Sequence, residues 1–89
     1  MTLGMALNNL YTNYKRYGYE KEELSSLLND GVRKGFSVNA AYNGIRMILA
    51  EATGEKEFFT IDDVAEITGE SPEDVTKRIE EYNNYLKAA

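Results

Sequence analysis

The sequence predicts an all-α fold, a compact bundle of about five short helices. Apolar residues recur at the three- and four-residue spacing of a helix face over most of the chain, and residues that favour helix ends stand between these stretches. No segment keeps the period-two alternation of a half-buried strand. The one candidate strand, "EFFTI" at 57–61, has no second strand to pair with. We therefore expect a single small helical domain over residues 1–89.

The first two predicted helices span residues 3–17 and 20–33. Gly18 favours the end of the first helix, because glycine readily adopts the positive φ of a helix C-terminus. Gly31 and Gly35 leave the end of the second helix open between them. The apolar faces contain Leu3, Leu7, Leu10, Tyr11 and Tyr14 in the first helix and Leu24, Leu27, Leu28 and Val32 in the second.

Three further helices are predicted at 38–53, 61–68 and 72–87. Each follows a residue whose side-chain oxygen can accept hydrogen bonds from the first amides of a helix. These caps are Ser37, Thr60 with Asp63 as a capping box, and Ser71, while Gly54 and Gly69 stand after the ends of the third and fourth helices. Pro72 at the first helical position strengthens the fifth start. The apolar faces contain Val38, Tyr42, Ile45, Leu49 and Ala52, then Ile61, Val64 and Ala65, then Val75, Ile79, Tyr82 and Leu86.

A chain of 89 residues has room for one modest hydrophobic core. No repeat, low-complexity tract or Pro/Gly/Ser-rich linker indicates a domain boundary. From the apolar faces we expect the core to contain Leu7, Leu10, Leu27, Leu28, Ile45, Leu49, Val64, Val75, Ile79 and Tyr82.

The composition excludes several classes of function. The sequence has no cysteine and no histidine, so it offers no disulfide, no thiolate nucleophile, no imidazole base and none of the usual zinc ligands. Asp62 and Asp63 stand at a predicted helix start, where carboxylates complement the helix dipole without any metal. We therefore expect no enzymatic activity, no cofactor and no metal site.

Apolar runs are short throughout. The longest, such as "MILA" at 47–50, cannot span a bilayer, and the first residues lack the basic and apolar regions of a signal peptide. We therefore expect a cytoplasmic protein with no membrane partner.

The stretch "DDVAEITGESPEDVTKRI" at 62–79 has the pattern of a helix, a tight turn and a second helix. Ala65 permits a close helix crossing, Gly69 permits the turn, and Val75 anchors the second helix. The stretch resembles the helix-turn-helix of response-regulator output domains and of the sigma-factor region that reads promoters. The resemblance covers residues 61–80 only and rests on Ala65, Glu66, Ile67, Gly69, Ser71, Pro72, Glu73, Val75 and Ile79.

Charge argues against DNA binding by this pair. In the family that it resembles, the second helix enters the major groove, whereas here that helix begins with Glu73 and Asp74. Residues 51–89 hold four Lys/Arg against eleven Asp/Glu, a net charge of −7, while residues 1–50 hold six against four, a net charge of +2. Because phosphate neutralisation supplies most of the non-specific affinity for DNA, we expect the acidic half to repel a duplex. We interpret the pair as a helix-turn-helix scaffold with a surface unsuited to DNA.

The preferred hypothesis is therefore a small acidic interaction module that binds a protein partner with a basic surface. One version is a regulator or inhibitor of a nucleic-acid-handling enzyme, by analogy with phage and mobile-element proteins that imitate the charge of nucleic acid. The expected contact face consists of Asp62, Asp63, Glu66, Glu70, Glu73, Asp74, Glu80 and Glu81.

The alternative hypothesis is a helix-turn-helix-like transcriptional regulator that binds nucleic acid through its basic N-terminal half, with a dimer adding positive charge. In "YTNYKRYGYEK" at 11–21, tyrosines interleaved with basic residues can stack on bases. Tyr11 and Tyr14 fit a second interpretation, in which they extend the apolar face into the core and keep their hydroxyls at its wet margin. The expected nucleic-acid contacts are Lys15, Arg16, Arg33, Lys34, Asn39, Asn43 and Arg46. The sequence leaves the partner, the oligomeric state and the biological process open.

Overall fold

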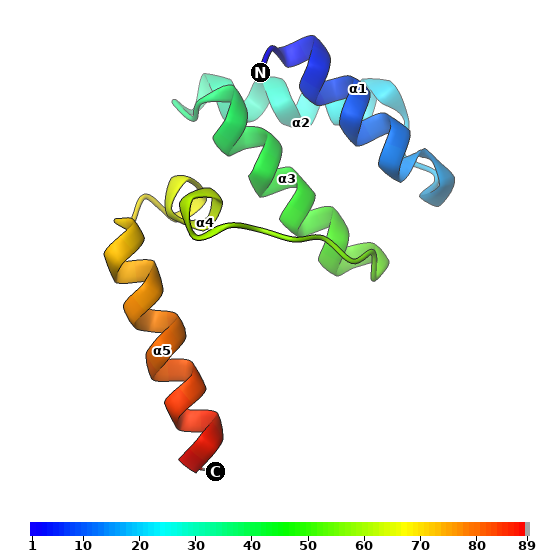
Figure 1. Cartoon of the computed structure of the whole chain (residues 1–89). Helices are drawn as coiled ribbons and strands as arrows, with labels where there is room; N and C mark the ends of the chain where they lie inside the picture. The colour runs from blue at the N-terminus through cyan, green and yellow to red at the C-terminus, as the bar shows by residue number, and fades with distance from the viewer. Residues whose placement is uncertain (89) are drawn as a thin grey trace. The chain divides into compact units, whose positions relative to one another are not determined.

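The computed structural model describes residues 1–88, and all of the regular structure in that range is helical (Figure 1). The elements are α1 (Leu3–Tyr14), the 3-10 turn η1 (Lys15–Tyr17), α2 (Lys21–Arg33), α3 (Val38–Thr53), α4 (Ile61–Thr68) and α5 (Pro72–Ala88). The predicted all-α class is confirmed, and no strand forms at 57–61. The helix bounds agree with the prediction to within one residue, except that the predicted helix 3–17 tightens into η1 over its last turn.

Side-chain caps fix the helix starts that the sequence predicts. The Ser37 hydroxyl accepts a hydrogen bond of 3.0 Å from an amide in the first turn of α3, and Ser71 accepts one of 3.1 Å in the first turn of α5. Thr60 and Asp63 form the predicted capping box at the start of α4. The glycines that were expected to end helices adopt positive φ angles: Gly18, Gly54 and Gly69. These local predictions are confirmed.

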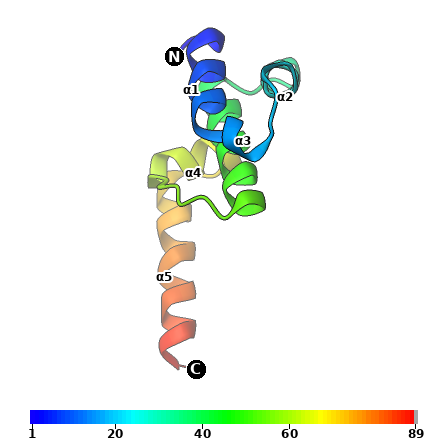
Figure 2. The same ribbon diagram turned by 90° about the vertical axis from the view of Figure 1, so that its right-hand side faces the viewer.

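Contacts within the chain form two compact units. The N-terminal unit is Met1–Phe58, in which α1, α2 and α3 pack against one another, and the C-terminal unit begins at Phe59 and contains α4 packed against α5. The sequence shows no linker at this boundary, which is why it predicted a single domain. After α3, residues 54–58 have no regular structure and fold back alongside that helix (Figures 1 and 2).

The core of the N-terminal unit lies where its three helices meet. Its buried side chains are Ala6, Leu10 and Tyr14 from α1, Leu24 and Leu28 from α2, and Ala41, Ile45 and Leu49 from α3. The predictions for Leu10, Leu28, Ile45 and Leu49 are confirmed, and Leu7 is partly buried against the cluster. The prediction for Leu27 is wrong: its side chain is exposed, because Leu24 and Leu28 occupy the core-facing side of α2 one turn apart.

The core of the C-terminal unit is much smaller. Ala65 and Val75 are buried there and Val64 is half-buried, whereas Ile79 and Tyr82 are exposed, so the prediction that these last two belong to a core is wrong. The reason is a difference in length. At 1.5 Å per residue, the eight residues of α4 extend for about 12 Å and the 17 of α5 for about 25 Å, so α4 can cover only the first turns of α5.

Candidate functional site

The predicted acidic contact face lies entirely in the C-terminal unit. Within the part of the chain that the structure describes, six of its eight side chains are exposed and form no hydrogen bond or ion pair: Asp62, Glu66, Glu73, Asp74, Glu80 and Glu81. The other two have partners. The Asp63 carboxylate accepts a hydrogen bond from the Thr60 amide at 3.1 Å, and Glu70 forms an ion pair of 2.7 Å with Arg78.

The whole net charge of the chain is located in this unit. Residues 1–58 contain seven Lys/Arg and seven Asp/Glu, whereas residues from 59 onward contain three and eight, which gives 0 and −5. The unit boundary gives a smaller charge difference than the split after Ala50, because Glu51, Glu55 and Glu57 belong to the N-terminal unit, but it leaves that unit with no net charge. A partner that approaches the C-terminal unit meets a negative potential with little local compensation.

Two features of the C-terminal unit display the carboxylates. An open hollow of about 510 Å³ lies where α4 turns into α5, and Asp62, Asp63, Glu66 and Glu70 line it together with Ala65, Gly69 and Pro72. Along α5, the spacing of 3.6 residues per turn places Glu73, Glu80 and Glu81 on the side of the helix opposite Val75 and Ile79. Within residues 1–88, no cluster of three or more His, Cys, Asp or Glu is arranged to hold a metal ion.

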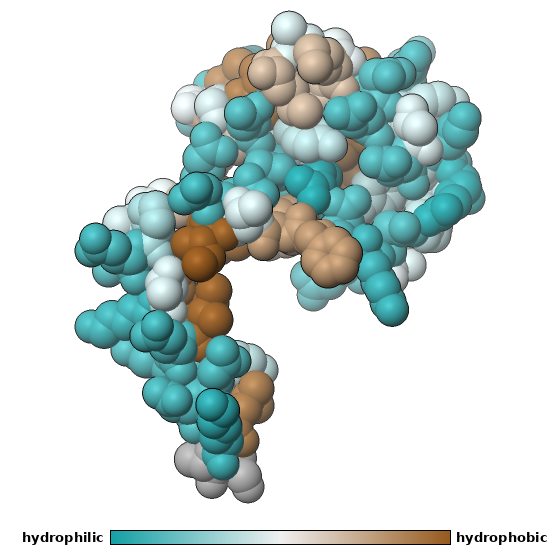
Figure 3. All heavy atoms as spheres, viewed as in Figure 1, coloured by the Kyte–Doolittle hydropathy of each residue, from teal (hydrophilic) through white to brown (hydrophobic). Residues whose placement is uncertain are grey.

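The other side of α5 is apolar. Figure 3 shows brown, apolar surface running along the long helix of the C-terminal unit beside teal, hydrophilic side chains. Ile79, Tyr82, Tyr85 and Leu86 are all exposed there, with about half or more of each residue open to solvent. The sequence places Ile79, Tyr82 and Leu86 on one helix face, and it predicted a core position for the first two.

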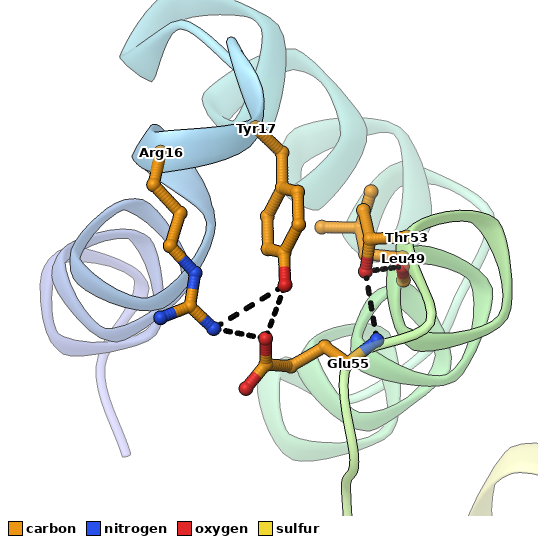
Figure 4. A network of polar contacts seen from close by, with 5 residues as sticks. All are labelled: Arg16, Tyr17, Leu49, Thr53 and Glu55. Atoms are coloured by element: carbon orange, nitrogen blue, oxygen red, sulfur yellow. Dashed lines mark hydrogen bonds and ion pairs between the residues drawn. The ribbon is translucent and has the colours of Figure 1, made fainter.

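The basic residues predicted to bind nucleic acid are mostly occupied within the N-terminal unit. Arg16 forms an ion pair with Glu55, and the Tyr17 hydroxyl donates a hydrogen bond to the same carboxylate (Figure 4). The hydrogen bonds from Tyr17 and Arg16 lower the pKa of Glu55, and those to Glu55 and Tyr17 raise the pKa of Arg16. Arg33 pairs with Asp30 at 2.9 Å.

Two lysines and one asparagine of that predicted set stay on the surface. Lys15 and Lys34 are exposed, and the Lys15 ammonium lies 5.9 Å from the centre of the Tyr11 ring. Asn39 is exposed as well. These three side chains are the members of the predicted nucleic-acid set that remain accessible without a salt bridge in the described structure.

Asn43 and Arg46 do not form the open polar face that the sequence indicated. Asn43 is only 6% exposed, and its side-chain oxygen accepts a hydrogen bond from Arg46 at 2.7 Å. Arg46 also binds the carboxylate of Glu57 and donates to the backbone oxygen of Phe58 at 2.9 Å, while its guanidinium lies over the Tyr42 ring. Residues 54–58 cover this part of α3, so Arg46 serves as the anchor that holds them. A partner eleven residues away, such as Glu57, leaves no local pattern in the sequence.

Tyr14 is buried completely, hydroxyl included. The expectation that its hydroxyl lies at a wet margin is therefore wrong, because residues 54–58 cover the end of α1 where this ring packs. Among the described residues its oxygen has no hydrogen-bond partner. Burial, and after it the nearby carboxylate of Glu57, raises the pKa of Tyr14 to about 12. Tyr14 is thus a core residue and is not available to stack on a base.

Comparison with known proteins finds no family model, no curated protein and no solved structure that matches this chain. The resemblance of residues 61–80 to a helix-turn-helix therefore stays a prediction. Within residues 1–88, no helix combines the length and the apolar character needed to cross a membrane.

Proposed function

We propose that this chain is an acidic interaction module whose C-terminal unit binds the basic surface of a protein partner. The observation that carries the proposal is the location of the whole net charge of −5 in that unit, with six exposed carboxylates that form no ion pair within the described residues. Uncompensated charge of one sign attracts a surface of the opposite sign over a distance and orients it during approach.

The geometry suits recognition of lysine and arginine side chains. Glu73, Glu80 and Glu81 project from one side of α5, a continuous helix of 17 residues that holds them at fixed spacing. The hollow between α4 and α5 offers carboxylates to a side chain that enters it, and Arg78 already occupies one of these, Glu70. In one version of this function, the basic surface is the nucleic-acid site of an enzyme that the module regulates or inhibits.

Several observations weigh against the alternative, a regulator that binds nucleic acid through the N-terminal half. The N-terminal unit has a net charge of zero. Of the seven predicted contacts, Arg16, Arg33 and Arg46 are paired with carboxylates of the same unit and Asn43 is buried. Phosphate contacts would require these ion pairs to break, which lowers the net gain from binding. The acidic module is the better supported hypothesis.

A matched pair of charge reversals tests the proposal. Glu80→Lys with Glu81→Lys changes the acidic face, and Glu22→Lys with Glu51→Lys makes the same change in net charge at exposed, unpaired positions of the N-terminal unit. Binding of a fluorescent lysine-rich peptide is measured for both variants and for the original protein at low and at physiological salt. We expect the first variant to bind about fivefold or more weakly and the second to keep most of the affinity, because only nearby charges contribute strongly in salt.

The same proteins are then titrated with single- and double-stranded DNA. Equal loss of peptide binding in the two variants would show that only total charge matters and would contradict a localised acidic face. Binding of DNA at physiological salt that is lost in Arg16→Glu with Lys34→Glu would support the regulator instead.

A further inference from the structure

The exposed apolar side of α5 has the spacing of a helix-pairing face. Ile79, Tyr82 and Leu86 follow Val75 at intervals of four, three and four residues, the alternation that places side chains along one seam of a coiled coil. Tyr85 borders them. We call Ile79, Tyr82, Tyr85 and Leu86 the α5 stripe. Their exposed fractions are 46%, 63%, 70% and 53%.

The core of the C-terminal unit is small, so exposure of the α5 stripe to water limits the stability of the unit. Its buried apolar side chains are Ala65 and Val75. Units shorter than about 40 residues usually depend on disulfides, metals or oligomerisation for stability. The sequence has no cysteine, so a disulfide is not available. Covering the α5 stripe with another apolar surface would add the burial that the unit lacks.

The charges around the stripe permit a second copy to approach, although the unit as a whole is acidic. Thr76 and Asn83 border the stripe on one side, and Arg78 borders it on the other with its charge balanced by Glu70. Of the carboxylates of α5, Glu73 and Glu80 lie on the opposite side of the helix, and Asp74 and Glu81 lie beyond Arg78 and Tyr85, away from Ile79, Tyr82 and Leu86. Two stripes can therefore meet without bringing carboxylates together, and like charges at such borders are what normally prevents pairing.

The ends of α5 carry opposite charges, and this sets the direction of pairing. Its first turn contains Glu73 and Asp74, and its last turn contains Lys87. In a parallel pair the two acidic turns would lie side by side. In an antiparallel pair the two acidic turns lie at opposite ends of the pair, and the helix dipoles are also opposed.

We propose that the α5 stripe pairs with the same stripe of a second copy of this chain, with the two helices antiparallel. The contact is a weak one. Four apolar side chains from each copy are far fewer than the roughly 20–30 residues a side of a standard stable interface, so we expect a dissociation constant of about 10–1,000 μM. The proposal uses the opposite side of α5 from the acidic face and does not depend on the proposed function.

Sedimentation equilibrium of the purified chain tests the pairing. Between about 10 μM and 1 mM, the range set by this expected affinity, the average mass should rise from that of one chain toward that of two. Leu86→Glu and Ile79→Glu should each keep the mass of one chain throughout. Ile48→Glu is the matched control, because Ile48 on α3 is 67% exposed and lies outside the stripe, and it should associate as the original protein does. Circular dichroism checks that each variant remains helical.

The direction of pairing has its own test. Glu73→Lys should change association by less than about twofold at physiological salt, because the antiparallel arrangement keeps the two acidic turns apart. In a parallel pair Glu73→Lys would strengthen association, which would overturn the antiparallel arrangement.

A chain that stays monomeric at about 1 mM overturns the pairing altogether. If Ile79→Glu also lowers the stability of that monomer, the stripe is covered from within the chain. Peptide binding by the acidic face is measured separately, in Leu86→Glu, and so its outcome is distinguishable from that of self-association.

Discussion

Gly31 of α2 lies so close to Ala41 of α3 that a β-carbon added to the glycine would stand 2.8 Å from the β-carbon of Ala41. No side chain tolerates that distance without a shift of one helix. A glycine that looks like a weak point in the sequence of α2 is therefore the residue that allows α2 and α3 to cross closely. Ala41 is the small side chain on the α3 side of this crossing.

Replacing this glycine should destabilise the protein. Gly31→Ala gains about 0.4–1 kcal/mol from reduced freedom of the unfolded chain, but overpacking at such a contact costs about 1–3 kcal/mol. We expect a net loss of about 1 kcal/mol in the free energy of unfolding in urea. Gly44→Ala is the control, since a β-carbon on this α3 glycine would meet nothing within 4 Å, and it should stabilise the protein. Stabilisation by both variants would show that the crossing is looser than described.

The C-terminal unit should depend on Val75 far more than on Ile79. Val75 is 1% exposed and Ile79 is 46% exposed. Truncation of a buried aliphatic side chain removes its transfer free energy and leaves a cavity, so Val75→Ala should cost about 2 kcal/mol and Ile79→Ala less than about 1 kcal/mol. Thermal unfolding at low protein concentration, where the chain is monomeric, checks the order. A larger cost at Ile79 would place that residue in a core after all.

The side chains of Arg46 and Glu57, which hold residues 54–58 against α3, should show a large coupling energy. The side chains of Arg46 and Glu57 are 17% and 12% exposed, and loss of one member of such a pair leaves the other charge largely buried. Arg46→Met should therefore cost about 3 kcal/mol, and Arg46→Met with Glu57→Gln should cost clearly less than the sum of the two single changes. A double-mutant cycle measured by urea unfolding gives the coupling. Additive costs would mean that the two side chains do not interact in solution.

Tyr14 should make the protein sensitive to alkaline pH. Its pKa is raised to about 12 from the ordinary 10.0, so the folded state keeps the phenol proton that the unfolded state releases. The stability associated with this raised pKa is fully present below pH 10 and is lost as pH rises through 12. In Tyr14→Phe the fall in melting temperature over this interval should be smaller than in the original protein.

The same variant has a second consequence near neutral pH. The Tyr14 hydroxyl is buried and has no hydrogen-bond partner among residues 1–88, so its removal should leave the melting temperature unchanged or raise it. Tyr17→Phe is the contrasting variant, because it removes the hydrogen bond to Glu55 at an exposed site. A marked loss of stability in Tyr14→Phe at pH 7 would reveal a hydrogen bond to this oxygen.

The helices of this protein could be predicted from the sequence because their ends are determined locally. Ser37 and Ser71 act on amides three residues away, and Gly54 and Gly69 act through their own backbone angles. The burial of Leu10 and Leu49 followed from the same short-range periodicity. Alanines such as Ala41 were missed, because a small side chain adds little to an apolar pattern even where it decides how closely helices pack.

The features that the sequence did not predict depend on distant parts of the chain. The apolar pattern shows that Ile79 and Tyr82 share one side of α5, but it does not say whether α4 is long enough to cover them. Nor does the pattern around Arg46 indicate that Glu57 will pair with it or that Asn43 will be buried beside it. The exposure of the acidic residues, in contrast, could be predicted without information on distant parts of the chain. Carboxylates are placed by their own preference for water, and six of the eight lie exposed and unpaired in the part of the chain that the structure describes.

Because α5 has one apolar side and one acidic side, the number of chains that can assemble through this helix is limited. A contact between two identical patches related by a two-fold axis is closed: each patch is used by the other, and no second apolar patch on α5 remains to recruit a third chain. Growth into filaments requires two different complementary patches on each molecule, and the carboxylates on the outer side of each α5 repel further copies. An assembly through α5 is therefore a closed dimer.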